Sequence, residues 1–222
     1  MDANMNQTSL DSSKYILWIH LKEDSNWQWD YYQTWGPLVK SQSFADHDGS
    51  ILNGRSCQYN TFGNLDSMGI FDHGKKNGSF FKYVTYRKDS FNIVKEYDYK
   101  EDSLVKVIDM KAKNHEKIDT LHERESEYPG GFTQWYRFLA KNLKYPDRAV
   151  NKEIQGQVQI RFIVDTAGVV QDPYIQKSLE YSLDQESLRI IGLSGEWDPA
   201  THDGEKVRSY KMQPFNFKLE AE

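Results

Sequence analysis

The sequence has little of several features that would assign a function at once. No apolar run approaches the roughly 20 residues that a membrane-spanning helix needs, and the longest, YILWI at residues 15–19, has the length of a strand. Cys57 is the single cysteine, so an intrachain disulfide is excluded. The net charge is −5, and no basic stripe marks a nucleic-acid surface. The first residues lack the pattern of a signal peptide, so we expect a protein that is not exported or one whose targeting segment was removed.

The sequence also has few signs of catalysis or metal binding. No two of the six histidines have the i, i+4 spacing of a helical zinc motif. The DHDG stretch at residues 46–49 lacks the further carboxylates of a calcium loop. Neither a glycine-rich phosphate loop nor a nucleophile elbow is present. We therefore expect no catalytic residue, no metal site, no cofactor and no enzyme activity.

Aromatic residues are frequent, at 14% of the chain, and the first half combines them with a β pattern. Residues 1–13 are polar and predict a disordered tail. Residues 14–110 predict a β-hairpin repeat region, because Tyr and Phe are frequent and glycines recur at hairpin spacing. A glycine is followed by a tyrosine five positions later at Gly54/Tyr59 and at Gly78/Tyr83, and KNG at residues 76–78 predicts a hairpin turn. This pattern resembles MORN-like repeats. The charged stretch 111–127 predicts a linker.

A helix with one aromatic face is predicted after this linker. Pro146 ends it, because the residue before a proline avoids helical angles. Its apolar positions follow a 3.6-residue repeat and predict a single packed face, formed by Phe132, Trp135, Tyr136, Leu139 and Leu143.

The remaining elements predict an α+β domain. Alternating apolar residues predict a half-buried strand at 156–164, followed by a turn at 165–168 and a second strand at 169–177. Ser182 and Gln185 have capping-box spacing and open a second helix. In the last strand, from about 206 to 219, the apolar phase slips at Pro214, which predicts an edge strand with a break near Gln213–Pro214. The fold class is therefore α+β: a C-terminal antiparallel sheet of about three strands packed on two helices, and an N-terminal mostly-β hairpin-repeat region.

Five separated motifs in residues 128–222 carry a further resemblance. In chain order they are NLKYP at 142–146, IQGQVQIRFIVDTAG at 154–168, LDQESLRII at 183–191, WDP at 197–199 and PFNFKL at 214–219. Together they resemble the C-terminal domain of TonB-family energy transducers. The resemblance covers about the last ninety residues, and it is the order of the five motifs that makes it specific.

The resemblance implies a periplasmic protein that binds by strand addition. Domains of this family capture a short segment of an outer-membrane transporter on the edge of the last strand, and another envelope protein is an equivalent partner. The implied partner-binding residues are Val207, Arg208, Ser209, Tyr210, Lys211, Met212, Gln213 and Phe215. Among these, Arg208, Tyr210 and Met212 are the candidates for side-chain contacts.

Two alternatives stay open at this point. Energy transducers of this family carry a membrane anchor and a proline-rich reach, whereas this sequence shows no anchor and six prolines, so the resemblance supports peptide binding more than force transduction. Any membrane attachment would come from a segment outside this sequence. The second alternative is a non-catalytic scaffold that forms a homodimer through the same sheet edge. No nucleic-acid partner is expected.

Overall fold

The computed structural model describes residues 13–87, 90–109 and 124–219 of the chain. The chain divides into two compact units, residues 1–117 and 118–222. Nearly all of the predicted tail at 1–13, and the predicted linker at 111–127 except residues 124–127, lie outside the described residues.

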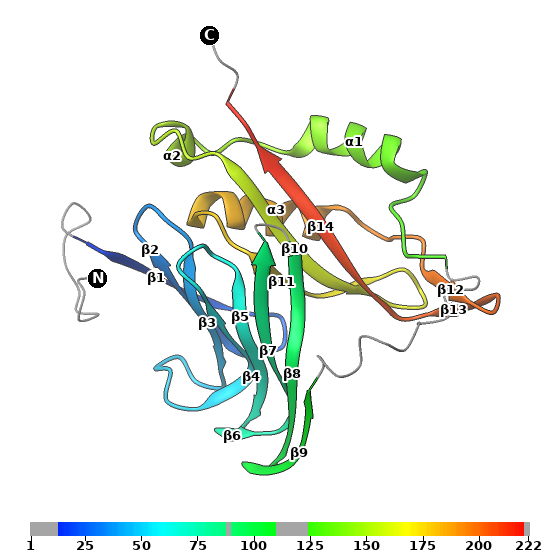
Figure 1. Cartoon of the computed structure of the whole chain (residues 1–222). Helices are drawn as coiled ribbons and strands as arrows, with labels where there is room; N and C mark the ends of the chain where they lie inside the picture. Colours follow the sequence, from blue (N-terminus) through cyan, green and yellow to red (C-terminus); the bar gives the residue numbers. More distant parts are fainter. Residues whose placement is uncertain (1–12, 88–89, 110–123, 220–222) are drawn as a thin grey trace. The chain divides into compact units, whose positions relative to one another are not determined.

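The N-terminal unit is one antiparallel sheet (Figure 1). Neighbours in the sheet are mostly neighbours in sequence, in the order β1-β2-β3-β4-β5-β7-β8-β9, and the short β6 pairs with β5. This confirms the predicted mostly-β region. The strands are β1 (Tyr15–Leu21), β2 (Trp27–Gln33), β3 (Leu38–Phe44), β4 (Leu52–Tyr59), β5 (Leu65–Asp72), β6 (Lys75–Lys76), β7 (Gly78–Arg87), β8 (Ser90–Lys100) and β9 (Ser103–Asp109).

The two glycine–tyrosine copies each lie within one strand of this sheet. Gly54 lies near the start of β4 and Gly78 begins β7, and both have a positive φ that favours glycine. Tyr59 and Tyr83 are both buried, at 9% and 4% exposure. Each copy thus combines a positive-φ glycine with a buried tyrosine, while the MORN-like assignment stays a prediction.

The hairpin turn was predicted in the wrong place. His73 and Gly74 both have positive φ and connect β5 to β6, as a tight two-residue hairpin requires. Asn77 only separates β6 from β7. The glycine at 78 marked the end of the connection and not the turn itself.

The C-terminal unit is a three-stranded antiparallel sheet with helices (Figure 1). The strand order is β11-β10-β14, and β12 and β13 form a separate hairpin. Its elements are α1 (Gly131–Asn142), α2 (Asp147–Val150), β10 (Gly156–Val164), β11 (Val170–Lys177), α3 (Tyr181–Leu193), β12 (Ala200–His202), β13 (Glu205–Val207) and β14 (Ser209–Phe217). The predicted fold class is confirmed.

The core of this unit lies on one face of the sheet. The four alternating apolar residues of β10, Val158, Ile160, Phe162 and Val164, are each 0% exposed, which confirms the predicted period of two. α3 packs on β10 and β11. α1 packs towards β14, where the ring centroids of Trp135 and Phe215 are 6.2 Å apart. Trp197 contacts the rings of Trp135 and Phe162 and joins these side chains into one aromatic core.

The predicted packed face of α1 is wrong in part. Trp135 is buried, but Phe132 and Tyr136 are 76% and 64% exposed. Apolar side chains occupy more of the surface of α1 than the core of the C-terminal unit covers. The 3.6-residue repeat therefore assigned buried and exposed residues to the same face.

The predicted break in the last strand is also wrong. β14 pairs with β10 without a register shift from Ser209 to Phe217, and Pro214 lies opposite Gln159. The chain breaks earlier, at Arg208, between β13 and β14. The apparent phase slip has a different cause: Tyr210 and Met212 are exposed on one face, and Phe215 and Phe217 are buried on the other.

The start of α3 differs from the predicted capping box. The cap is Glu180, whose carboxylate accepts hydrogen bonds from the Ser182 N–H at 2.8 Å and the Ser182 Oγ at 2.6 Å.

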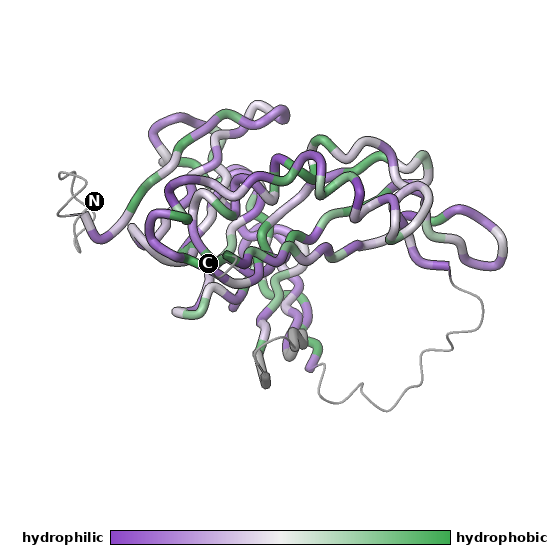
Figure 2. Tube along the Cα trace, turned by 90° about the horizontal axis from the view of Figure 1, so that it is seen from above, coloured by the Kyte–Doolittle hydropathy of each residue, from purple (hydrophilic) through white to green (hydrophobic). Residues whose placement is uncertain are grey.

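No helix among the described residues combines the length and apolar character that crossing a bilayer requires. Figure 2 shows apolar residues in short stretches that polar ones interrupt.

Candidate functional site

The open edge of β14 is the candidate site. β14 pairs with β10 along its nine residues, and no other described strand pairs with its second side. An edge strand presents main-chain N–H and C=O groups that another chain can pair with. The prediction of an edge strand is therefore confirmed for the described part of the chain.

The main-chain groups of β14 alternate between the sheet and the open edge. Proline has no N–H to donate, so a regular ladder places Pro214 among the residues whose main-chain groups point away from β10. Gln213 Nε2 donates to the Pro214 carbonyl oxygen at 3.2 Å. This contact is consistent with a Pro214 carbonyl that does not take part in the β10–β14 hydrogen bonds. Alternate residues of a strand direct their groups to the same side. Tyr210 and Met212 therefore direct theirs to the open edge.

The side chains of the same two residues are exposed. Tyr210 is 64% and Met212 is 47% exposed. The Arg161 guanidinium lies 4.8 Å from the centroid of the Tyr210 ring, from the neighbouring strand β10. Such cation–π contacts hold an aromatic ring in place. The edge therefore offers a positioned ring and a flexible thioether beside free main-chain groups.

The other predicted site residues are spread over several environments. Val207 belongs to β13 and pairs with Ala200, and Arg208 is exposed between β13 and β14. Ser209, Lys211 and Gln213 are half-buried and pair with Val164, Phe162 and Ile160. Phe215 is 1% exposed and belongs to the core, so its ring is not available to a partner. Lys211 Nζ lies 3.4 Å from Glu125 Oε2 in an exposed ion pair.

A shallow hollow lies at the start of this edge. Its volume is about 190 Å³, and it is lined by Ile163, Arg208, Ser209 and Tyr210. Sequence reasoning missed Arg161 and Ile163, which lie on β10. The available signal was the alternation in QVQIRFIV, because its polar phase places Arg161 on the face opposite the core.

Charged side chains fix the segment that joins α1 to β10, which contains NLKYP. Glu186 accepts a hydrogen bond from the Lys144 N–H at 2.7 Å, and Arg189 donates to the Asn142 carbonyl at 2.7 Å. Hydrogen bonding to Glu186 raises the pKa of Arg189. Tyr145 Oη donates to the Ile154 carbonyl at 2.6 Å. These contacts set the position of α1 relative to the sheet.

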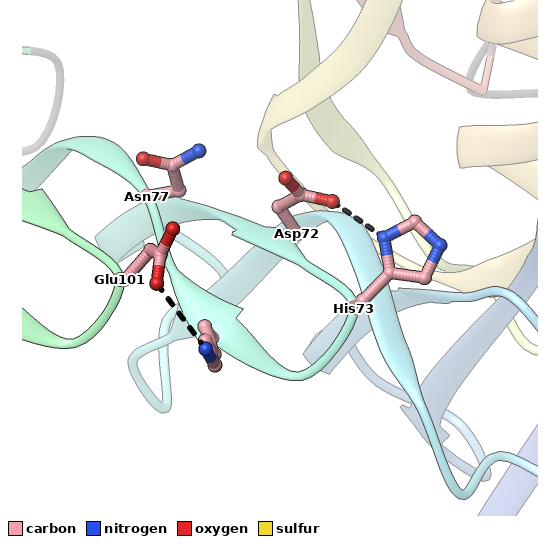
Figure 3. A pocket seen from close by; sticks show the side chains of 5 residues that line it. Asp72, His73, Asn77 and Glu101 are labelled. Carbon is pink, nitrogen blue, oxygen red and sulfur yellow. Dashed lines mark hydrogen bonds and ion pairs between the residues drawn. The ribbon is translucent and has the colours of Figure 1, made fainter.

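A second hollow, of about 170 Å³, lies in the N-terminal unit (Figure 3). His73 Nδ1 is 2.6 Å from Asp72 Oδ1, and Lys75 Nζ is 3.3 Å from Glu101 Oε2. Asn77 completes the lining. The polar groups thus contact one another at the surface. No group of three or more metal-ligating side chains occurs among residues 13–87, 90–109 and 124–219.

The fold and the edge together define a class of protein: a small α+β domain whose last strand has one unpaired edge among the described strands. Residues 141–219 match the family model described as Gram-negative bacterial TonB protein C-terminal, which confirms the resemblance carried by the five motifs. The match covers about a third of the chain. The searches of curated proteins and of solved structures found no significant match. The match points to a TonB-like role in envelope transport, because the family consists of non-catalytic energy transducers whose C-terminal domains are periplasmic.

Proposed function

We propose that the C-terminal unit binds a short extended segment of an outer-membrane transporter by strand addition on β14, in the periplasm. The observation that carries this proposal is the one-sided pairing of β14 over its full length. Strand addition uses main-chain hydrogen bonds for affinity and side-chain contacts for selectivity.

The alternation of main-chain groups limits how far the captured segment pairs. Pro214 offers only a carbonyl on the open side, and Gln213 already donates to it. Regular pairing therefore extends from Arg208 to Gln213. A ladder of this length forms about four to six hydrogen bonds, each worth ~0.5–1.5 kcal/mol net.

Main-chain pairing alone does not give tight binding, because ordering a residue of the peptide costs ~1–2 kcal/mol. Micromolar affinity corresponds to about −8 kcal/mol, so side-chain contacts must supply the difference. Tyr210 and Met212 provide apolar surface, while Arg208 and Arg161 provide positive charge beside the hollow. Val207 and Phe215 contribute through the position of the strand.

Replacing Tyr210 by proline tests the proposal. Tyr210→Pro removes an outward N–H and should weaken binding at least tenfold while the fold is kept, since Pro214 is already accommodated in this strand. The measurement is fluorescence anisotropy with a labelled peptide that contains a transporter TonB box. Tyr210→Ala is the matched control, because it removes the ring and keeps the N–H, and it should weaken binding less than proline does.

Two results would contradict strand addition on β14. One is unchanged peptide binding by Tyr210→Pro with a native near-ultraviolet circular dichroism spectrum. The other is a tight homodimer, detected by light scattering, that does not dissociate or bind when the peptide is added. That result would favour the scaffold that dimerises through the same edge.

We also propose that residues 14–110 form a hairpin-repeat module and residues 128–222 the binding domain, with 111–127 as the linker between them.

A further inference from the structure

α1 has an exposed aromatic face that the core does not use. Phe132 and Tyr136 are 76% and 64% exposed, and their ring centroids are 6.2 Å apart. They are spaced i, i+4, so they form one ridge on the helix surface. Ala140 continues the ridge and is also exposed. The buried Trp135 lies on the adjacent side of the helix, next to this ridge.

A second ridge beside the first is polar and basic. Thr133, Arg137 and Lys141 follow the same i, i+4 spacing and are exposed. α1 contains no acidic residue, and neither Arg137 nor Lys141 forms an ion pair within the described residues. The chain as a whole has a net charge of −5, so this positive surface runs against the overall balance. A cation in the last turn, such as Lys141, favours the helix dipole, but Arg137 lies outside that turn.

We propose that this face of α1 is a docking surface for an acidic protein segment that carries a large apolar side chain. The apolar side chain would lie against Phe132 and Tyr136, and the carboxylates would lie opposite Arg137 and Lys141. Charge complementarity selects an acidic occupant, and the exposed ring pair selects one with an apolar anchor. The surface is separate from the open edge of β14 and does not depend on strand addition.

The test is selection from a random dodecapeptide display library against the full chain. Enriched peptides should contain at least two acidic residues and one aromatic or long aliphatic residue. Binding of a labelled enriched peptide, measured by fluorescence anisotropy, should weaken at least tenfold in Phe132→Ser and in Arg137→Glu. It should also weaken as the salt concentration rises, because exposed ion pairs are screened.

Matched controls come from the N-terminal unit. Phe62 is 79% exposed, so Phe62→Ser removes an equally exposed ring, and Lys100→Glu reverses an exposed charge. Neither should alter binding of the enriched peptide, and nor should Tyr210→Pro. If Tyr210→Pro still binds the transporter peptide, strand addition on β14 is contradicted, but the proposed docking surface on α1 is unaffected.

Three outcomes would overturn the docking surface. The enriched peptides could lack acidic residues, or they could bind the two α1 variants as well as they bind the unaltered chain. In the third outcome, the chain sediments with anionic phosphatidylglycerol vesicles but not with phosphatidylcholine vesicles, and Phe132→Ser abolishes this sedimentation. That result would assign the face to a lipid surface instead.

Discussion

At the scale of single residues, a buried carboxylate connects two parts of the C-terminal unit. Glu180 is 0% exposed, and its Oε1 accepts a hydrogen bond from Arg148 Nε at 2.6 Å. Its other oxygen caps α3 through Ser182. Glu180 therefore ties the short helix α2, which carries Arg148, to the start of α3.

Removing this carboxylate should be costly. Glu180→Ala should lower the free energy of unfolding by about 3–5 kcal/mol, because it leaves the Arg148 guanidinium without its buried partner and removes the helix cap. The measurement is urea unfolding followed by tryptophan fluorescence. Glu196→Ala is the matched control at an exposed position and should stay within about 0.5 kcal/mol of the unaltered chain. Equal effects of the two substitutions would contradict the role of Glu180.

Asp30 should make stability depend on pH in the opposite sense to an ordinary ion-paired aspartate. Burial raises the pKa of Asp30 from 3.8 to about 6, and hydrogen bonds from Ser41 and Gln28 oppose the shift. Between about pH 4 and pH 6 the folded chain holds a proton that the unfolded chain releases. The contribution of Asp30 to the free energy of unfolding is therefore greatest below this window and falls as the pH rises through it.

Asp30→Asn should remove this dependence. At pH 7 the substitution should raise the free energy of unfolding by up to about 3 kcal/mol, and below pH 4 it should have little effect. The difference between the two chains, measured by urea unfolding at several pH values, isolates the contribution of Asp30 from that of other acids. A difference that stays constant from pH 4 to pH 7 would contradict the prediction.

At the scale of elements, the sequence predicts correctly the helices and strands that have one apolar and one polar face. β10 was predicted correctly because four of its apolar residues alternate on the core side and its other face is polar except for Ile163. β14 and α1 were predicted incorrectly in detail because each carries apolar residues on an exposed face as well. Tyr210, Met212, Phe132 and Tyr136 are the residues responsible. The same residues form the two surfaces proposed for binding, so local rules failed where partners are expected.

Other parts of the site depend on contacts between distant residues and leave no local signal. The predicted turn at 165–168 ends at Gly168, whose φ is +90°. The sequence did not show that a Cβ there would lie 2.2 Å from the Trp197 carbonyl oxygen. Likewise, the contact of Arg161 with Tyr210 depends on the pairing register of β10 and β14. Register between strands about fifty residues apart is set by the whole sheet.

At the scale of the whole molecule, two units of different architecture share one chain. The family match lies within residues 118–222, and the nine-stranded sheet lies within residues 1–117. The proposed strand addition on β14 involves residues of the C-terminal unit alone. The proposed linker at 111–127 should therefore be dispensable for peptide binding.

Limited proteolysis of the full chain tests this division. The stretch 111–127 contains Lys111, Lys113, Lys117 and Arg124, and its charged composition predicts a linker that trypsin reaches first. Brief digestion should give two fragments that meet within this stretch, identified by mass spectrometry. The C-terminal fragment should bind the transporter peptide with the affinity of the uncut chain, because every residue of the β14 edge lies within it. Early cleavage at Lys40 or Lys82, which lie inside paired strands, would contradict the division. Loss of peptide binding on cleavage would show instead that the N-terminal sheet takes part in capture.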